Sequence, residues 1–356
     1  MTLSPGPVDA PVQSPRQSVP ADAAGTGGVK ALVFLRDRGI VILWLLLVVV
    51  FAFWAEPYFF TWTNARLIAN AAALSALFAA AVAFGIMSGA LDLSIPASAA
   101  LAGVVAGKLL TNGSPASVAI IVALLSGAAV GLCNGLLIQR RLNPLVVTIA
   151  TLTTVGGIAN LISGGVAIRG LDQLDWAGNG RPFGIPSMVF IVIGLYLAAW
   201  LFLVNTRAGG RLQAVGGSSE AVRRIGLNAD AYRILGFVLG STCAALAGLG
   251  TVATTRQASP TASVNLLFAA LTAVALSGMP LTGGRGSFPR VLVGTLIIAT
   301  INSALIIRGI QPYWTTIITG VLLIFALAFD KLMTDAVTAR LTESAHRSVH
   351  ETVEEQ

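Results

Sequence analysis

The chain has 356 residues, of which 55% are hydrophobic and only 10% are charged. A soluble domain usually carries about 25% charged residues, so this composition disfavours a soluble helical bundle, whose helices would need polar outer faces. The net charge is +7, but the basic residues fall in short connections between apolar runs, as membrane orientation requires. We therefore expect the lipid bilayer as the surrounding medium and no nucleic-acid partner.

Long apolar runs predict an all-α, polytopic membrane protein with about ten transmembrane helices. A helix of about 20 apolar residues spans the hydrocarbon of a bilayer. The predicted crossings are residues 39–55, 67–90, 95–110, 116–139, 145–165, 187–205, 234–255, 266–280, 288–307 and 312–329, of which the third and eighth are short. Residues 1–37 are predicted as a disordered cytoplasmic tail, residues 38–331 as the transmembrane domain, and residues 332–356 as a cytoplasmic C-terminal tail.

The distribution of arginine favours a cytoplasmic location for both termini. With the N-terminus inside, ten crossings return the C-terminus to the same side. The inner connections then carry Arg140, Arg141, Arg207, Arg211, Arg223, Arg224, Arg233, Arg285 and Arg290. The outer connections carry fewer arginines, together with Glu56, Asp172 and Asp175. Because cytoplasmic loops are enriched in Lys and Arg, this bias predicts the orientation.

Two segments indicate an internal repeat. The sequences "NGLLIQRRLNP" (134–144) and "NSALIIRGIQP" (302–312) share Asn, Leu-Ile, Arg and Pro at identical offsets. In the predicted topology the first copy leaves the membrane inside and the second outside. The two halves would therefore run in opposite directions, as in transporters that bind their substrate between inverted repeats.

The stretch "GALDLSIPASAALAG" (89–103) places Asp92 between two apolar runs. A charged side chain at a helix centre costs about 2.5–3.5 kcal/mol on insertion scales, and an interrupted helix exposes backbone donors. Asp92 and Ser94 can cap the N–H groups of a new helix, in whose first turn Pro96 is tolerated. Capping and direct contact with a substrate both remain open for this break.

Further polar residues inside the apolar runs are candidates for a substrate pathway. Thr148 belongs to the hydroxyl-rich stretch "TIATLTTVGG" (148–157), and Asn134 and Asn302 occupy equivalent positions of the repeat. These side chains could hydrogen-bond a neutral polyol, or they could simply pack helices together. Asp92 is the one carboxylate near the membrane interior, and His346 and His350 both lie in the C-terminal tail, which argues against a proton-coupled carrier.

Nothing in the sequence predicts catalysis or a cofactor in this chain. It has no G-x-x-x-x-G-K-[ST] motif to cradle the phosphates of ATP. No spacing of residues indicates a metal site, a nucleophilic triad or a pair of catalytic carboxylates. We therefore expect a protein that is not an enzyme and that takes any ATP-driven step from a partner.

The longest inner connection, residues 205–233, contains the sequence "SSEAVRRIG", which predicts a short helix. Ser218 or Ser219 can cap its start, and Gly226 can end it. Its other residues are Glu220 in the first turn, Arg223 and Arg224 near the end, and Ala221, Val222 and Ile225 as an apolar stripe. Such a helix can lie on anionic lipid or dock into a groove of another protein, and the residues alone leave both possibilities open.

Together these segments resemble the permease subunit of bacterial ABC importers for monosaccharides, the branch that includes ribose, xylose and arabinose permeases. The resemblance covers about residues 38–331. It is carried by residues 89–103, by "NGLLIQRRLNPLVVTIATLTTVGGIANLISGG", by "AVGGSSEAVRRIGLN", and by the long segment from "LTGGRGSFP" to "IFALAFDK". Relative to the family signature Gly-Ile-Asp-Leu-Ser-Val-Gly, the Asp-Leu-Ser core is intact and Pro96 stands for the final Gly.

The resemblance implies a multi-pass protein of the bacterial plasma (inner) membrane. The implied partners are a cytoplasmic ATP-binding cassette protein, an extracytoplasmic sugar-binding protein and a second permease, in a homodimer or a heterodimer. It also implies that residues 214–228 couple to the ATPase, through Gly216, Glu220, Ala221, Arg223, Arg224 and Gly226. The alternatives are an ABC permease for branched-chain amino acids or another small solute, and an ion-coupled secondary carrier.

Overall fold

The computed structural model describes residues 26–311, 313–328 and 331–332. The chain divides into two units, residues 1–39 and residues 40–356. Within the described residues the chain is almost entirely helical, with one pair of two-residue strands. The all-α fold class predicted from the apolar runs is thereby confirmed.

In the described part of the chain, six helices are long and apolar enough to cross a membrane, and four further apolar helices are shorter. The long ones are α2 (Trp62–Met87), α4 (Ala116–Gln139), α5 (Pro144–Ser163), α7 (Ser187–Asn205), α10 (Ala229–Thr255) and α12 (Phe288–Ile307). The shorter ones are α3 (Ile95–Thr111), α11 (Val264–Leu276), the part Arg38–Trp54 of α1, and Tyr313–Ala328. Each predicted crossing falls on one of these helices, and the predicted third and eighth crossings are indeed among the short ones.

The first helix, α1 (Thr26–Trp54), begins earlier than the sequence predicts. Residues 26–37, assigned to a disordered tail, form its first turns. The reason is visible in the sequence, since "VKALVFL" (29–35) follows the last glycine of the tail without a helix breaker. The predicted tails of residues 1–25 and 333–356 lie outside the described residues.

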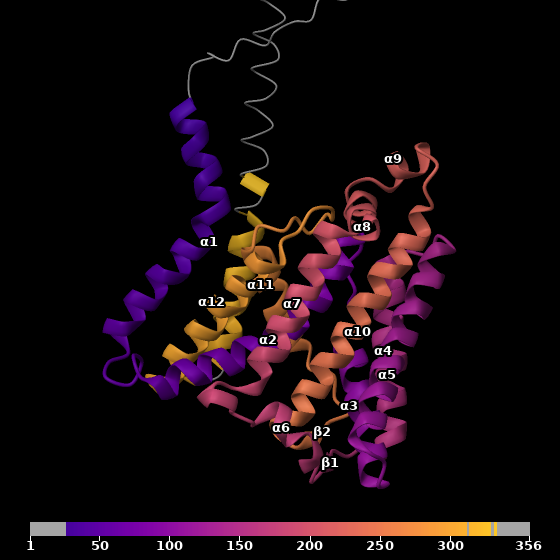
Figure 1. Cartoon of the computed structure of the whole chain (residues 1–356), viewed down its shortest axis with the longest axis horizontal. Coiled ribbons are helices and arrows are strands. Elements are labelled where there is room, and N and C mark those ends of the chain that lie inside the picture. Colours follow the sequence, from indigo (N-terminus) through magenta and orange to yellow (C-terminus); the bar gives the residue numbers. More distant parts are fainter. Residues whose placement is uncertain (1–25, 312, 329–330, 333–356) are drawn as a thin grey trace, which may run out of the picture. The chain divides into compact units, whose positions relative to one another are not determined.

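Short elements mark the two ends of the helices. At the upper end of Figure 1 lie α8 (Arg207–Gly217) and α9 (Ser219–Arg224), and at the lower end lie α6 (Asp175–Gly178) and the strands β1 (Ile168–Arg169) and β2 (Gln257–Ala258). We call these the α9 end and the α6 end. Two 3₁₀ turns, Asp172–Leu174 and Pro182–Gly184, flank α6.

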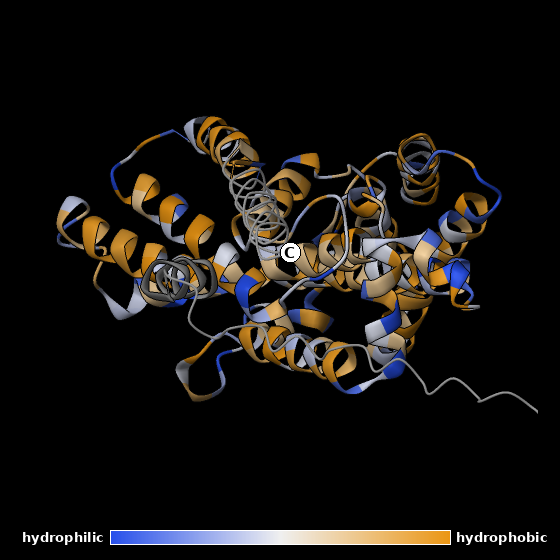
Figure 2. Ribbon diagram, turned by 90° about the horizontal axis from the view of Figure 1, so that it is seen from above, coloured by the Kyte–Doolittle hydropathy of each residue, from blue (hydrophilic) through white to orange (hydrophobic). Residues whose placement is uncertain are grey.

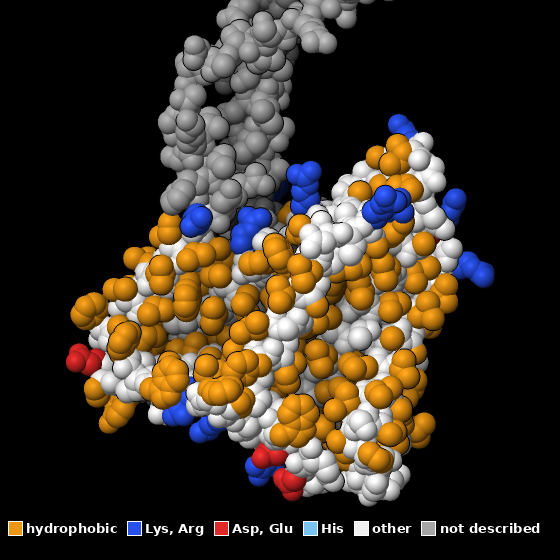
Figure 3. All heavy atoms as spheres, in the orientation of Figure 1, with side chains coloured by type: hydrophobic (Ala, Val, Ile, Leu, Met, Phe, Trp, Pro, Cys, Tyr) orange, Lys and Arg blue, Asp and Glu red, His pale blue; other side chains and the backbone are white. Residues whose placement is uncertain are grey.

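The helices between the two ends are apolar, whereas the hydrophilic residues gather in the connections (Figure 2). In the space-filling view, hydrophobic side chains cover the surface over α7 and α2. Lys and Arg lie toward the α9 end, and both signs of charge lie near the α6 end (Figure 3). An apolar surface of this extent on a folded chain indicates contact with lipid.

The packing of α10 shows how the first half of the chain is oriented. A Cβ atom on Gly127 of α4 would lie 2.5 Å from the Cβ atom of Ala245, and one on Gly135 would lie 2.9 Å from the Cα atom of Ile234. The two helices are therefore antiparallel and in backbone contact, as glycine permits between membrane helices. Along α2 and α10 the contacts also run in opposite directions, since Gly236 meets Ser88 and Gly250 meets Leu77.

The helix α12, in the second half of the chain, runs antiparallel to α2. The Ser303 hydroxyl, near the end of α12, donates to Asn64 at the start of α2. At the other end, the rings of Phe84 and Phe288 are 5.0 Å apart, so α2 and α12 are antiparallel. Because α4 runs parallel to α2, the helices α4 and α12, which carry Asn134 and Asn302, point in opposite directions. The two Asn-containing segments thus run in opposite directions, as the predicted inverted repeat requires.

Candidate functional site

The break between α2 and α3 is organised around Asp92, whose side chain is 2% exposed. Its Oδ1 atom accepts hydrogen bonds from the Ser94 backbone N–H at 2.8 Å and from the Ser94 hydroxyl at 2.6 Å. Pro96 lies in the first turn of α3, as predicted. Ser94, however, makes no side-chain cap to the helix, because its hydroxyl is turned toward the carboxylate. Its predicted capping role is wrong.

A chain of hydrogen bonds extends from this break to α4 and α5. Asn134 of α4 is fully buried, donates to the Ser94 hydroxyl at 2.9 Å and accepts from the Thr151 hydroxyl of α5 at 2.6 Å. Three predicted candidates, Asp92, Ser94 and Asn134, are therefore brought together. We call Asp92, Ser94, Asn134 and Thr151 the polar network.

Two other candidates lie apart from the polar network. The hydroxyl of Thr148 is turned to the Leu145 carbonyl of its own helix. Asn302 is half-buried on α12, and its side chain makes no hydrogen bond among the described residues. The two copies of the repeat thus run in opposite directions, and their polar contacts differ.

The second carboxylate oxygen of Asp92 faces α10. This Oδ2 atom and the Ser241 hydroxyl are both buried without a hydrogen-bond partner within the described part of the chain, and Ser241 lies beside the carboxyl group. A buried polar atom without a partner is costly, and the Ser241 hydroxyl is the neighbouring group that can donate to this carboxylate.

The connection between α7 and α10 contains two helices rather than the single short one predicted. Residues 207–217 form α8, which buries Gly209, Leu212, Val215 and Gly216. Gly216, one of the residues expected to couple to the ATPase, is buried against Met87 and Gly284. It therefore does not belong to an exposed contact face.

The second helix of this connection, α9, has the ends that the sequence predicts. The Ser218 hydroxyl accepts from the Ala221 N–H at 3.2 Å, and Gly226 follows the helix with a positive φ of 79°. Glu220 and Arg224 form an exposed ion pair of 2.5 Å. Ala221 is also exposed.

The apolar residues of α9 have separate roles. Val222 is buried and packs with Val215 of α8 and Ala229 of α10. Ile225, by contrast, is 72% exposed. The predicted apolar stripe is therefore divided between a residue that anchors α9 and a residue that the protein leaves uncovered.

Polar contacts fix α8 and α9 to the first turns of α10. Arg211 of α8 donates to the Tyr232 hydroxyl at 2.6 Å, and Arg223 of α9 pairs with Asp230 at 2.7 Å. Asp230 also lies in the first turn of α10, where the helix dipole favours a negative charge. The exposed face of α9 is consequently presented on a rigid support.

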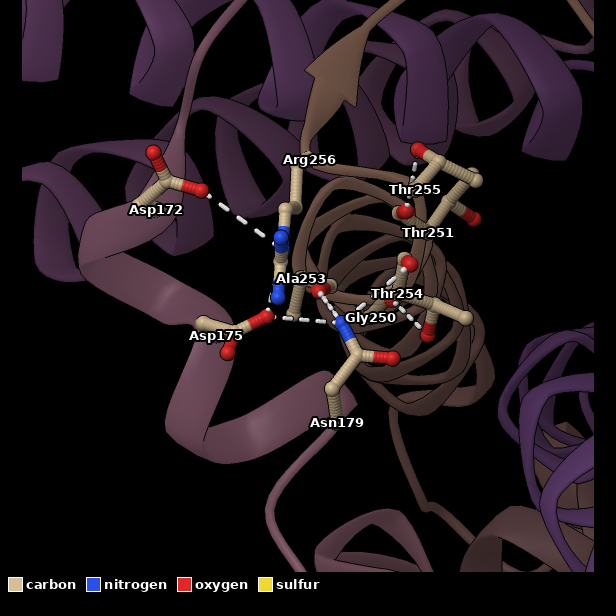
Figure 4. Close-up of polar contacts among 9 residues, drawn as sticks. All are labelled: Asp172, Asp175, Asn179, Gly250, Thr251, Ala253, Thr254, Thr255 and Arg256. Carbon is tan, nitrogen blue, oxygen red and sulfur yellow. Dashed lines mark hydrogen bonds and ion pairs between the residues drawn. The ribbon is translucent and has the colours of Figure 1, made fainter.

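At the α6 end, a cluster of charges joins the connection after α5 to the end of α10. The Arg256 guanidinium lies between two carboxylates, 2.7 Å from Asp175 and 3.5 Å from Asp172, as Figure 4 shows. Hydrogen bonds from Arg256 and Asn179 hold the pKa of the Asp175 carboxyl below its ordinary value. The same pairing with Asp175 raises the pKa of Arg256.

The backbone around this cluster packs closely against the end of α10. The Asn179 amide also donates to the Ala253 carbonyl at 3.3 Å, serving the otherwise unpaired carbonyls of a helix end. Gly178 lies so close that a Cβ atom would be 2.1 Å from the Ala253 carbonyl carbon. β1 pairs with β2 in antiparallel register, Ile168 opposite Ala258. The α6 end is thus a folded surface and not a loose loop.

Several residues of these sites carry no signal in the sequence. Thr151 is one of several hydroxyl residues on α5, and only the position of Asn134 selects it. Ser241 lies in an ordinary apolar run, and Tyr232 and Asp230 belong to no motif. Helix periodicity does link Thr151 with Thr148, since residues three apart share a face, but it does not tell which of them meets α4.

The fold and these two ends define a class of protein. The features are those of a multi-pass membrane permease: long apolar helices, a broken helix tied into a polar network, and an exposed helix held at one end. The chain belongs to the family described as branched-chain amino acid transport system permease components, which it matches over residues 64–327.

Individual relatives are permeases for sugars. The chain is 32% identical to the ribose import permease protein RbsC of Escherichia coli over 281 residues, covering 77% of this chain and 88% of that protein. It is 32% identical to the L-arabinose ABC transporter permease protein AraH of Azospirillum brasilense (87% and 91%). With the D-allose transport system permease protein AlsC of E. coli it shares 29% identity (85% and 93%). No solved structure matches the chain.

Proposed function

We propose that this chain is the transmembrane permease subunit of an ATP-driven ABC importer, and that it forms the translocation pathway for a monosaccharide. The observation that carries the proposal is similarity over most of the chain to permeases named for three monosaccharides: ribose, L-arabinose and D-allose. The composition of the helices agrees, because a neutral polyol needs few charges along its route. Asp92 is the one buried carboxylate within the described residues.

We assign one proposed partner to each of the two ends. A cytoplasmic ATP-binding cassette protein docks on α9, where Glu220, Arg224 and Ile225 are exposed. An extracytoplasmic sugar-binding protein delivers its ligand at the α6 end. Both termini lie in the cytoplasm of a bacterial cell, and the ten apolar helices are ten crossings. ATP is bound by the partner, and this chain needs no cofactor and catalyses no reaction of its own.

A second copy of the permease completes the pathway. Of the six long helices, α5 is the least covered by the rest of the protein: only 22% of an 18-residue apolar segment of this helix is buried. Its exposed residues include Thr153, Thr154, Gly157 and Asn160. Polar side chains are costly in hydrocarbon, whereas small and polar residues suit contacts between membrane helices and water-lined routes. This face is therefore covered by a partner permease, in a homodimer, and lines the route of the sugar.

The polar network holds this route in place. Asp92, Ser94 and Asn134 are too deeply buried to meet a sugar in the present arrangement, but they tie the α2–α3 break to α4 and α5. Thr148, Pro96 and Asn302 act through helix packing. The transmembrane domain extends over residues 38–331, residues 205–233 form its coupling loop, and the flanking tails lie in the cytoplasm.

Transport by the reconstituted complex tests the substrate class. Proteoliposomes containing the permease, its ATPase and its binding protein are offered radiolabelled pentoses, hexoses and branched-chain amino acids. We expect ATP-dependent accumulation of a monosaccharide and no accumulation of leucine or isoleucine.

The family description favours one second candidate, a permease for branched-chain amino acids. Accumulation of an amino acid, without accumulation of any sugar, would establish that candidate. An amino acid also carries two opposite charges, so its transport would be expected to need buried counter-charges beyond Asp92.

A further inference from the structure

Three backbone segments meet without intervening side chains at the α9 end. They are the end of α2, the end of α8 and the loop between α11 and α12. A Cβ atom on Gly216 of α8 would lie 2.2 Å from the Met87 carbonyl oxygen and 2.7 Å from the Gly284 nitrogen. Real Cβ atoms do not approach so closely, so this contact requires glycine.

The loop between α11 and α12 needs glycine for the same reason. A Cβ atom on Gly283 would lie 2.6 Å from the Gly216 carbonyl oxygen and 3.0 Å from the Cα atom of Gly89. Gly89 and Gly283 also have positive φ angles of 85° and 104°, which favour glycine. We call Gly89, Gly216 and Gly283 the glycine joint.

The glycine joint connects the two parts of the candidate site. On one side, α8 carries α9 through the packing of Val215 on Val222. On the other side, Gly89 leads directly into the break that ends at Asp92, and a Cβ atom on Gly85 would lie 3.6 Å from the Asp92 Cβ atom. A displacement of α8, which carries α9, therefore reaches the α2–α3 break through direct backbone contacts.

We propose that the glycine joint transmits movement of α8 and α9 to the α2–α3 break, and so couples the nucleotide cycle of the partner to opening of the pathway. The proposal rests on the proposed function, in which an ATPase docks on α9. Close-packed backbone segments shift as a body, whereas long side chains can absorb a displacement by changing rotamer. The three glycines are positioning residues, since none of them meets the substrate.

The other close glycines of the helices serve a different purpose. Two glycines of α4, Gly127 and Gly131, allow close packing against α10, and Gly248 of α10 allows close packing against α3. Each of these contacts joins only two helices. The glycine joint instead brings together three connections at the end where α9 is exposed. If the glycine joint only packs the helices, replacing its glycines should weaken assembly of the complex. If it transmits movement, the complex should still assemble, but ATP hydrolysis should no longer drive uptake.

The test compares Gly216→Ala and Gly283→Ala with two matched controls in the complete reconstituted complex. Gly217→Ala changes the next residue of α8, and Gly278→Ala changes a residue of the same loop whose φ is 74°; neither Cβ atom would meet anything within 4 Å. Binding of the ATPase, ATP hydrolysis and sugar uptake are measured for each. Allosteric coupling typically amounts to about 5- to 150-fold, so we expect uptake per ATP hydrolysed to fall at least about fivefold in the joint variants.

The expected result is that the joint variants still bind the ATPase and hydrolyse ATP, while the controls transport like the wild type. Wild-type uptake per ATP in both joint variants would overturn the proposal. Loss of assembly in both of them, and also in Gly89→Ala, would equally overturn it and assign the glycines to packing. Absence of ATP-driven uptake in the wild-type complex would instead contradict the proposed function, and the joint would fall with it.

Discussion

Asp92 occupies a position where a carboxylate would ordinarily be unfavourable. Its Oδ1 atom receives both the backbone N–H and the hydroxyl of Ser94, which satisfies one side of the group. The Ser94 hydroxyl in turn accepts from Asn134, so the break is linked to α4 by an uninterrupted series of hydrogen bonds. The residue is therefore better explained as the anchor of a broken helix than as a solitary charge in the membrane.

The first prediction concerns Asn134. Asn134→Ala leaves the hydroxyl of Thr151 without its acceptor and removes the donor to Ser94. We expect a loss of about 1–3 kcal/mol in the free energy of unfolding, measured in mixed micelles. Asn302→Ala, at the equivalent position of the repeat, is the control and should cost less than about 0.5 kcal/mol. Equal losses in the two variants would mean that the hydrogen bonds of Asn134 do not stabilise the fold.

The second prediction concerns the charge cluster around Arg256. The pKa of Asp175 is lowered in the folded protein, so its ionised form stabilises the fold at pH values above the ordinary carboxyl pKa. This stabilisation is lost as the pH falls through the lowered value. We expect the melting temperature of Arg256→Gln to fall less steeply on acidification than that of the wild type.

Because Asp175 and Arg256 are exposed, solvent weakens the pair and the difference should be small. Arg181→Gln provides the control, since it removes the same charge from the same end of the helices and Arg181 forms no ion pair among the described residues. Melting curves recorded from neutral to acidic pH should superimpose for Arg181→Gln and the wild type. If the melting temperature of Arg256→Gln depended on pH in the same way as that of the wild type, the pair of Asp175 with Arg256 would not stabilise the fold.

At the scale of helices, α9 combines a fixed face with an uncovered one. Val222 and the Arg223–Asp230 pair hold it to α10, while Ile225 stands exposed beside two charged residues. A single large apolar side chain within a polar rim is typical of an anchor in a protein interface. The rigid support means that little ordering is needed when a partner binds.

The third prediction tests this interface. Ile225→Asp should reduce co-purification of the ATPase at least about tenfold, the size of effect expected for an interface anchor, without changing the melting temperature of the permease. As a matched variant, the exchange Glu220→Arg with Arg224→Glu keeps the ion pair within α9 but reverses its charges. We expect this exchange also to weaken binding, because docking involves charge as well as apolar contact. Unchanged co-purification of both variants would show that the ATPase binds elsewhere.

The sequence predicts some of these elements better than others. Apolar runs locate α4, α7 and α12 closely, because length and hydropathy alone decide whether a helix can cross a bilayer. The ends of α9 follow from its cap residue and its terminal glycine. The helix α8 is missed, since "RAGGRLQAVGG" (207–217) contains four glycines and reads as a loop. Its glycines are instead required by contacts with other segments, which no local pattern reveals.

The candidate site is predictable to a similar, partial degree. Asp92, Ser94 and Asn134 stand out because polar residues are rare in such runs. Their mutual contacts depend on how α3, α4 and α5 pack, so the sequence does not distinguish Thr151 from Thr148. The pairing of β1 with β2 joins two-residue strands far apart in the chain, and strands this short leave no periodicity to detect.

For the whole molecule, both proposed partners depend on the orientation in the membrane, with the α9 end in the cytoplasm and the α6 end outside the cell. The fourth prediction uses single cysteines in a background where Cys133 and Cys243 are replaced. Phe183→Cys, near the α6 end, should react with an impermeant maleimide in intact cells, because this side chain is 96% exposed. Ile225→Cys should react only after the membrane is permeabilised. The reverse pattern would place α9 outside the cell, where no ATPase could dock.

The most direct test of the central claim is the energy source of transport. Proteoliposomes carry the permease with its ATPase and binding protein, ATP is trapped on the α9 side, and labelled sugar is added on the α6 side. We predict uptake that requires the trapped ATP and disappears when the ATPase is replaced by a variant unable to hydrolyse it. Uptake of sugar by the permease alone, driven by an ion gradient and indifferent to ATP, would contradict the account.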